Sequence, residues 1–175
     1  MAGIVKVGEF EISSPVSTVD LDNVFSDTYD VFMIKCKSVG SDTNSVTLRM
    51  RFIKDDGTVD TNTSYATANL NIADFSTTIN RLESNGINQF YLSRVSMGTS
   101  TEEFTNLIIY CFNTRLSLHT NFVYLNSTLD PNVDLKIERG QGYHSQNEKI
   151  RGVQLFSSSG NLDNGKFVVY GFKKS

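Results

Sequence analysis

Hydrophobic and polar residues alternate along several short stretches of this chain, which is the pattern of half-buried β-strands. The alternation is most regular from Val46 to Phe52, where every second residue is apolar and the residues between them are Thr or Arg. Residues 29–39 and 116–125 alternate in the same way. Each stretch predicts a strand that turns one face toward a core and the other toward solvent.

Weaker patterns predict further strands elsewhere. They lie at 4–12, within 13–28, within 58–72, at 89–95 and at 104–112, with a short one at 133–137 inside a mainly looped region. Residues 76–85 start with Ser/Thr and end before Gly86, which fits either a short helix or a loop. About eight to ten short strands with at most one short helix, and no βαβ alternation, predict an all-β sandwich or barrel.

The last two dozen residues predict two strands, 150–156 and 166–172, joined by a loop rich in Ser, Gly, Asn and Asp. Such a loop supplies the positive φ angles and local hydrogen bonds of a chain reversal, so we expect a hairpin. A C-terminal strand this apolar would expose a sticky edge unless it paired inside a sheet. We therefore expect it to close the sandwich.

Two of the predicted strands, 104–112 and 166–172, are apolar on both faces. A two-sheet sandwich buries only one face of each sheet. The second apolar face must be covered by a loop, by the N-terminal segment or by another protomer. A homo-oligomer is therefore expected, with Tyr170 and Phe172 as candidate partner-binding residues.

A cationic patch is the second candidate surface. If strands 31–37 and 46–53 form a hairpin, Lys35, Lys37, Arg49 and Arg51 share its outer face. Like charges that face each other across strands are destabilising. The patch either docks on an acidic partner or is a solvated face.

The bulk composition describes one domain, residues 1–175, with 39% hydrophobic residues and a formal net charge of −3. That charge gives no general attraction to nucleic acid or anionic membrane. No apolar run approaches the roughly 20 residues of a membrane span. The start of the chain lacks the basic and apolar regions of a secretory signal, so we expect synthesis in a cytoplasm.

The residues that usually carry chemistry are few. His119 is expected on the outer face of its strand and His144 in a loop, and neither has a second ligand at metal-binding spacing. Asp55 and Asp56 are explained by turn chemistry, with a loop calcium site as the alternative. We expect no catalytic residue, no metal and no cofactor. Cys36 and Cys111, in apolar strands, are expected as buried free thiols, although a disulfide between them stays open.

Several of these segments resemble one known pattern. They are Tyr29–Ile34, Val46–Phe52, Gly57, Tyr65, Phe104–Tyr110, Ile150–Asn161 and Gly165–Phe172. Together they resemble small jelly-roll-like domains of bacteriophage virion proteins, most closely in the C-terminal Ser-Ser-Gly-Asn and Phe-Val-Val-Tyr-Gly-Phe segments. The resemblance spans residues 4–173, but 66–88 and 126–148 follow no recognised pattern. The resemblance implies loops in those two regions, and binding specificity would lie there.

The resemblance implies a jelly-roll-like antiparallel β-sandwich and a non-enzymatic virion structural protein, displayed as a head decoration or tail-accessory protein. Its partners would be other virion proteins. The alternative is a receptor- or carbohydrate-binding module of a tail fibre that meets a host-surface glycan, with Tyr65, Tyr91 and Tyr143 as stacking residues and no Trp to help them. A glycan-degrading enzyme is a third reading and needs two carboxyls facing across a cleft. The position on the particle, the oligomeric order and the host receptor stay open.

Overall fold

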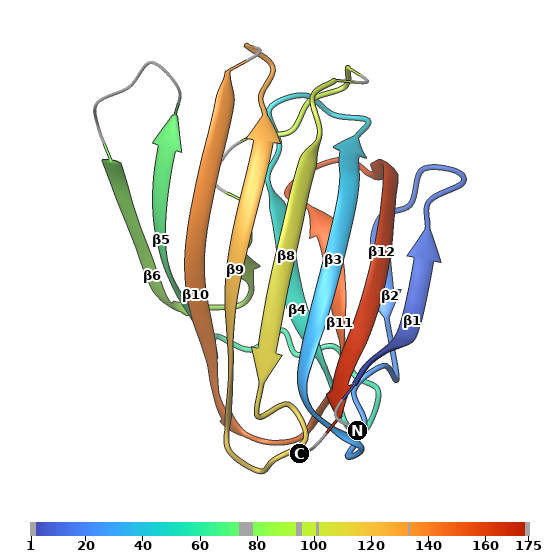
Figure 1. Cartoon of the computed structure of the whole chain (residues 1–175). Coiled ribbons are helices and arrows are strands. Elements are labelled where there is room, and N and C mark those ends of the chain that lie inside the picture. Colours follow the sequence, from blue (N-terminus) through green and yellow to red (C-terminus); the bar gives the residue numbers. More distant parts are fainter. Residues whose placement is uncertain (1–2, 74–78, 94–95, 101, 133, 174–175) are drawn as a thin grey trace.

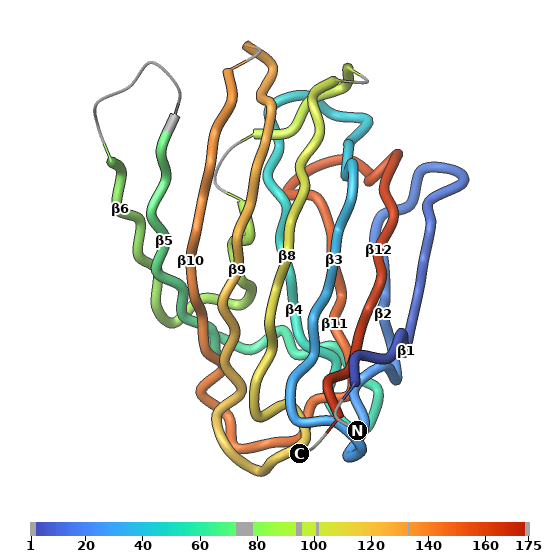
Figure 2. The backbone as a smooth tube through the Cα atoms, in the orientation of Figure 1, coloured from blue at the N-terminus to red at the C-terminus, as the bar shows by residue number. Residues whose placement is uncertain are grey.

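The computed structural model describes residues 3–73, 79–93, 96–100, 102–132 and 134–173, and within them the chain is all-β. Two antiparallel sheets pack face to face, and Figures 1 and 2 view them from the side of the larger sheet. The predicted β-sandwich is confirmed. The described residues form twelve strands, more than the eight to ten expected.

The larger sheet has eight strands. Their order across the sheet is β1 (Ile4–Glu11), β12 (Leu162–Lys173), β3 (Tyr29–Ser41), β8 (Thr105–Phe112), β9 (His119–Leu129), β10 (Leu135–Asn147), β5 (Tyr65–Ala73) and β6 (Ile79–Ile87). The smaller sheet has four strands, in the order β2 (Thr18–Leu21), β11 (Ile150–Ser157), β4 (Leu48–Lys54) and β7 (Phe90–Tyr91).

The core lies between the two sheets and follows the period-2 alternation of the strands. In β8, Leu107, Ile109 and Cys111 are buried, and the residues between them face away from the smaller sheet. In β4, Met50 and Phe52 are buried from the opposite side. Since successive side chains of a strand point to opposite faces, the alternation in the sequence identified these inward residues.

The two last strands do not form the expected hairpin. β11 pairs with β2 and β4 in the smaller sheet, whereas β12 pairs with β1 and β3 in the larger one. The loop between them crosses from one sheet to the other. β12 is nevertheless paired along both edges, as its apolar composition required.

The expected hairpin of strands 31–37 and 46–53 is also wrong. β3 belongs to the larger sheet and β4 to the smaller one. The segment between them crosses between the sheets, and Val46 pairs with Met97 instead of with β3. Alternation tells which face of a strand is buried but not which strand lies beside it.

Two regions predicted as helix or loop are strands. Residues 79–85 lie in β6, at the edge of the larger sheet, while 76–78 lie outside the described residues. Residues 135–147 form the long strand β10 and not mainly a loop. Both strands lack apolar alternation. Most side chains of β6 are exposed, and β10 turns Glu138 and His144 inward instead of apolar residues.

Two further predictions are partly corrected. Only Phe90–Tyr91 of the expected strand 89–95 is a strand, and residues 94–95 lie outside the described residues. Leu116 and Leu118 precede β9 in an exposed loop instead of joining its inner face. The inward residues of β9 include Phe122 and Tyr124, as expected.

Candidate functional site

The candidate site is the outer sheet face, by which we mean the face of the eight-stranded sheet that points away from the four-stranded sheet. The strand registers place a set of exposed large apolar side chains on it. They are Ile4 of β1, Ile72 of β5, Ile79 of β6, Val123 and Leu125 of β9, and Leu135, Ile137 and Tyr143 of β10. This face is the one turned toward the viewer in Figure 1.

Tyr170 and Phe172 lie on the outer sheet face, and both side chains are half-buried. In the register, Tyr170 is opposite Met33, which is in turn opposite Tyr110. The ring centroids of Phe172 and Tyr110 are 6.3 Å apart. β12 is therefore apolar on both faces, as its sequence indicated, and its outer side chains connect the exposed apolar residues of β1 with those of β9 and β10.

The four cations do not form one patch, because β3 and β4 belong to different sheets. Lys35 and Lys37 are exposed on the outer sheet face. Arg49 and Arg51 lie on the outward side of the smaller sheet, and the expectation of a shared face is wrong. Whether any of the four binds a partner stays a prediction.

The two arginines are occupied by contacts within the chain. The Arg49 guanidinium lies 5.3 Å from the ring centroid of Tyr91, and the Arg51 guanidinium lies 4.8 Å from that of Phe156. Arg51 Nε also donates to the backbone oxygen of Asn88 at 3.0 Å. These contacts orient both side chains over neighbouring strands.

A charged rim borders the outer sheet face at β1 and β12. Lys166 Nζ lies 2.5 Å from Glu9 Oε1 and 3.1 Å from Glu11 Oε2, and Lys6 Nζ lies 2.6 Å from Glu9 Oε2. The hydrogen bonds from Lys166 and Lys6 lower the pKa of Glu9 to about 2. Glu9 therefore stays ionised well into acid.

A trough of about 580 Å³ lies on the outer sheet face where β5 carries two alanines. Ala66 and Ala68 form its floor, because their side chains are short. Tyr143 and Gln141 of β10 stand on one side of them, and Glu83 and Asn85 of β6 on the other, as the strand registers require. The trough combines an aromatic ring with amide and carboxylate groups.

The three tyrosines considered for sugar stacking have different environments. Tyr65 is fully buried, so its proposed stacking role is wrong. Tyr91 is half-buried beneath Arg49. Tyr143 is 42% exposed at the trough, with its ring 6.0 Å from that of His119. Of the three tyrosines, Tyr143 is the one that lines the trough.

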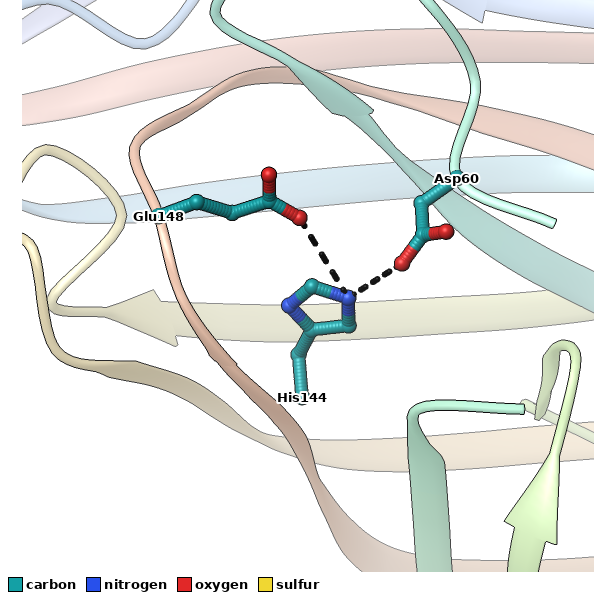
Figure 3. Close-up of side chains that lie close together, drawn as sticks. All are labelled: Asp60, His144 and Glu148. Atoms are coloured by element: carbon teal, nitrogen blue, oxygen red, sulfur yellow. Dashed lines mark hydrogen bonds and ion pairs between the residues drawn. The ribbon is translucent and has the colours of Figure 1, made fainter. Parts of the chain in front are cut away.

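A second constellation lies inside the sandwich, and Figure 3 shows its three side chains. His144 Nε2 is 2.5 Å from Asp60 Oδ2 and 3.9 Å from Glu148 Oε1. The side chains of His144 and Asp60 are closed to solvent, and that of Glu148 is 35% exposed. His144 is therefore a buried residue of β10, and its expected position in a loop is wrong.

The neighbours of this cluster hold both groups in place. Asp60 Oδ1 accepts from the backbone N–H of Asn62 at 2.9 Å and from its side-chain amide at 2.8 Å. The hydroxyl of Tyr65 donates to the backbone oxygen of Asp60 at 2.7 Å. The rings of Phe52 and Tyr65 pack against the imidazole, with centroids 5.6 and 5.0 Å away.

The ligand atoms of Asp60, His144 and Glu148 lie within 4.8 Å of one another, so the three residues could hold a divalent cation. His and carboxylate ligands are a set that zinc accepts. The pair also forms a hydrogen bond between His144 Nε2 and the Asp60 carboxyl group, while His144 Nδ1 is buried without a hydrogen-bond partner among the described residues. Sequence reasoning missed both acidic neighbours, although Glu148, four residues after His144, was visible as a candidate.

A further buried carboxylate, Glu138, lies on the same strand six residues before His144. Glu138 Oε1 accepts from the side-chain amide of Asn69 and from the hydroxyl of Tyr124, both at 2.6 Å. Glu138 is 1% exposed. Such a buried acid is tolerated because hydrogen bonds such as these two to Oε1 offset the loss of water.

The two cysteines are buried and free, as predicted. Burial raises the pKa of the Cys36 thiol far above its ordinary value and that of Cys111 to about 12. Both therefore stay protonated in the core and serve as small apolar side chains.

Comparison with known proteins finds no match: no protein-family model and no curated sequence matches this chain. Among the residues that the structure describes, no helix has the length and apolarity needed to cross a bilayer.

Proposed function

We propose that this chain is a structural protein of a bacteriophage particle, displayed as a head decoration or tail-accessory protein and acting through protein–protein contacts. The motif resemblance of the sequence supports the link to a phage particle. The outer sheet face supports the mode of action, and it is the observation on which the proposal rests.

The outer sheet face exposes many large apolar side chains. Eight of them, from Ile4 of β1 to Ile79 of β6, are 42–59% exposed. Exposed apolar side chains gathered on one face mark protein–protein contacts in many proteins. The face is therefore a candidate for burial against neighbouring proteins in an assembly.

The charges around the face favour a protein partner of mixed charge. Lys35 and Lys37 are exposed on it, and the rim of Glu9, Glu11 and Lys166 carries both signs. A rim of this kind fixes the register of a partner and adds little affinity.

The test is to locate the chain on virions produced from the genome that encodes it. A label fused to the chain and imaged by electron microscopy should lie on the capsid shell for a decoration protein or at the tail for an accessory protein. Label on neither would overturn the virion proposal.

A matched pair of substitutions tests the surface. Leu125 is 54% exposed on the outer sheet face, and Leu118 is 52% exposed in the loop before β9. Leu125→Glu should prevent incorporation into particles, because it buries a charge in the contact. Leu118→Glu should leave incorporation unchanged. Equal incorporation of both variants would show that the face is not the contact.

A second candidate function, glycan binding, is favoured by the trough. The Tyr143 ring offers a stacking platform, and Gln141, Asn85 and Glu83 offer hydrogen bonds suited to hydroxyl groups. Glycan-array binding that Tyr143→Ala abolishes, and that Tyr91→Ala leaves intact, would support this function. An array without any bound glycan would contradict it.

A further inference from the structure

The two sheets have four edges, and three of them are built in ways that prevent pairing with another strand. β2 has four residues and β7 has two, so both edges of the smaller sheet are short. β1 is interrupted by a register shift between Lys6 and Gly8. Short edge strands and bulges are the usual protections of exposed edges.

β6 is longer than β2 and β7, and its register shift lies near its end. Its pairing with β5 is regular from Ile79 to Asn85, and the register shift comes only after Asn85. Gly86, with φ of +62°, follows and ends the straight part of the strand. Among the described strands, β6 is therefore the one long, regular edge, and it lies at the margin of the sheet in Figure 1.

The side chains of this straight segment have a symmetric order. Leu82 is the middle residue of Ile79–Asn85 and lies on the inner side of the sheet. Arg81 and Glu83 flank it on the outer sheet face, opposite Leu70 and Ala68 of β5. Their side chains are 76% and 68% exposed.

We propose that two copies of this chain pair through β6, antiparallel, about a two-fold axis at Leu82. Each Arg81 then lies opposite Glu83 of the second copy, and the two Leu82 side chains lie opposite each other. The whole straight segment from Ile79 to Asn85 takes part. The eight-stranded sheets of the two copies become one continuous sheet, and the outer sheet face extends across both.

The charges select this register. Opposite charges directly across neighbouring strands are stabilising, and like charges are destabilising. Moving the pairing by two residues in one direction places Glu83 opposite Glu83, and in the other direction Arg81 opposite Arg81. Moving the pairing by one residue places the outward side chains of one copy opposite the inward side chains of the other, so that the outer sheet faces no longer match. The pairing at Leu82 is therefore the one nearby register in which both charges are matched.

Dimer formation costs little stability within each copy, because the intrachain ion pair at the interface is weak. Arg81 Nη2 lies 3.3 Å from Glu83 Oε1 within the same strand, and both groups are well exposed. An exposed pair of this kind contributes little stability. On pairing, each charge gains a second partner, and the backbone of the edge strand forms ladder hydrogen bonds with the second copy.

The experiment is sedimentation equilibrium on the purified full chain from about 1 μM to about 1 mM, the range in which weak association is measured. The wild-type chain should dimerise. Arg81→Glu and Glu83→Arg should each raise the dissociation constant at least about tenfold, because two favourable pairs become two like-charge pairs. The double variant R81E/E83R should dimerise like the wild type, because the exchanged charges match again.

The most decisive measurement mixes the two single variants. Arg81→Glu has an acidic side chain at both positions, and Glu83→Arg has a basic side chain at both. The mixture should therefore form a heterodimer, although each variant alone stays monomeric. A wild-type monomer over the whole range would overturn the proposal. So would single variants that still dimerise, or a dimer that Leu125→Glu dissolves and these variants do not.

The inference adds a partner to the proposed function without depending on it. Circular dichroism of every variant checks that the fold is kept, which is expected since both side chains are exposed. Sedimentation uses the purified chain without virions, so its outcome does not depend on where the labelled chain lies on the particle.

Discussion

His144 Nε2 lies 2.5 Å from Asp60 Oδ2, although the two residues are 84 positions apart in the chain and both are buried. His144 belongs to β10 of the larger sheet. Asp60 follows β4 of the smaller sheet, and its backbone N–H donates to the backbone oxygen of Phe52 at 2.9 Å. The contact therefore connects the two layers of the sandwich through polar groups in an apolar core.

We expect His144→Ala to lower the free energy of unfolding by about 3–5 kcal/mol, because it leaves the carboxylate of Asp60 buried without its partner. Urea denaturation followed by circular dichroism measures the change. His119→Ala is the control. His119 is exposed, so the loss should stay within about 0.5 kcal/mol. Similar losses for the two variants would mean that the buried pair contributes little.

Gly142 of β10 lies beneath an aromatic ring, and its replacement should disturb the core. A Cβ at this position would lie 2.5 Å from Cε1 of Phe122 and 2.8 Å from the backbone oxygen of Ala66. We expect Gly142→Ala to destabilise the fold by about 1–3 kcal/mol, the usual effect of overpacking. The urea midpoint measures it. Gly3→Ala has no atom within 4 Å of the new Cβ and should be neutral, and equal midpoints would contradict the close packing.

The salt bridges of Glu9 should make stability depend on pH in acid. Lys166 and Lys6 lower the pKa of Glu9 from 4.5 to about 2 in the folded chain. The unfolded state therefore binds the proton first as the pH falls. The stabilisation is complete above about pH 4.5 and is lost as the pH falls toward about 2.

The measurement is the difference in urea midpoint between the wild type and Glu9→Gln at several pH values. The difference should be small, since the groups are exposed, and should disappear near pH 2. Glu102→Gln removes a charge from an exposed loop and should show no such dependence. A difference that persists below pH 2 would mean that Gln disturbs the structure in some other way.

The buried thiols should be unreactive in the folded protein. Burial raises the pKa of both Cys36 and Cys111, and the thiolate is the reactive form. We expect Ellman's reagent to label neither cysteine in the native state and both in urea. Rapid labelling of either in the native protein would show that the core opens readily at β3 or β8.

The alternation of the sequence determined the fold class and much of the core. The period of two places Val46, Leu48, Met50 and Phe52 on one face whatever their neighbours are, because backbone geometry alone sets it. The same argument identified the inward residues of β8, the burial of the two cysteines, and the apolar outer faces of β8 and β12.

The tertiary structure alone decided which strands are neighbours. It placed β3 and β4 in different sheets, and therefore Lys35 and Arg49 on different faces. The hydrophobic pattern of a strand could not predict this, because the pattern is the same in either sheet. It made 79–85 an edge strand, since hydrogen bonds from β5 outweigh the local preference of a polar segment. It also brought Asp60 to His144, because the distance between residues far apart in sequence depends on how the sheets pack and on no local pattern.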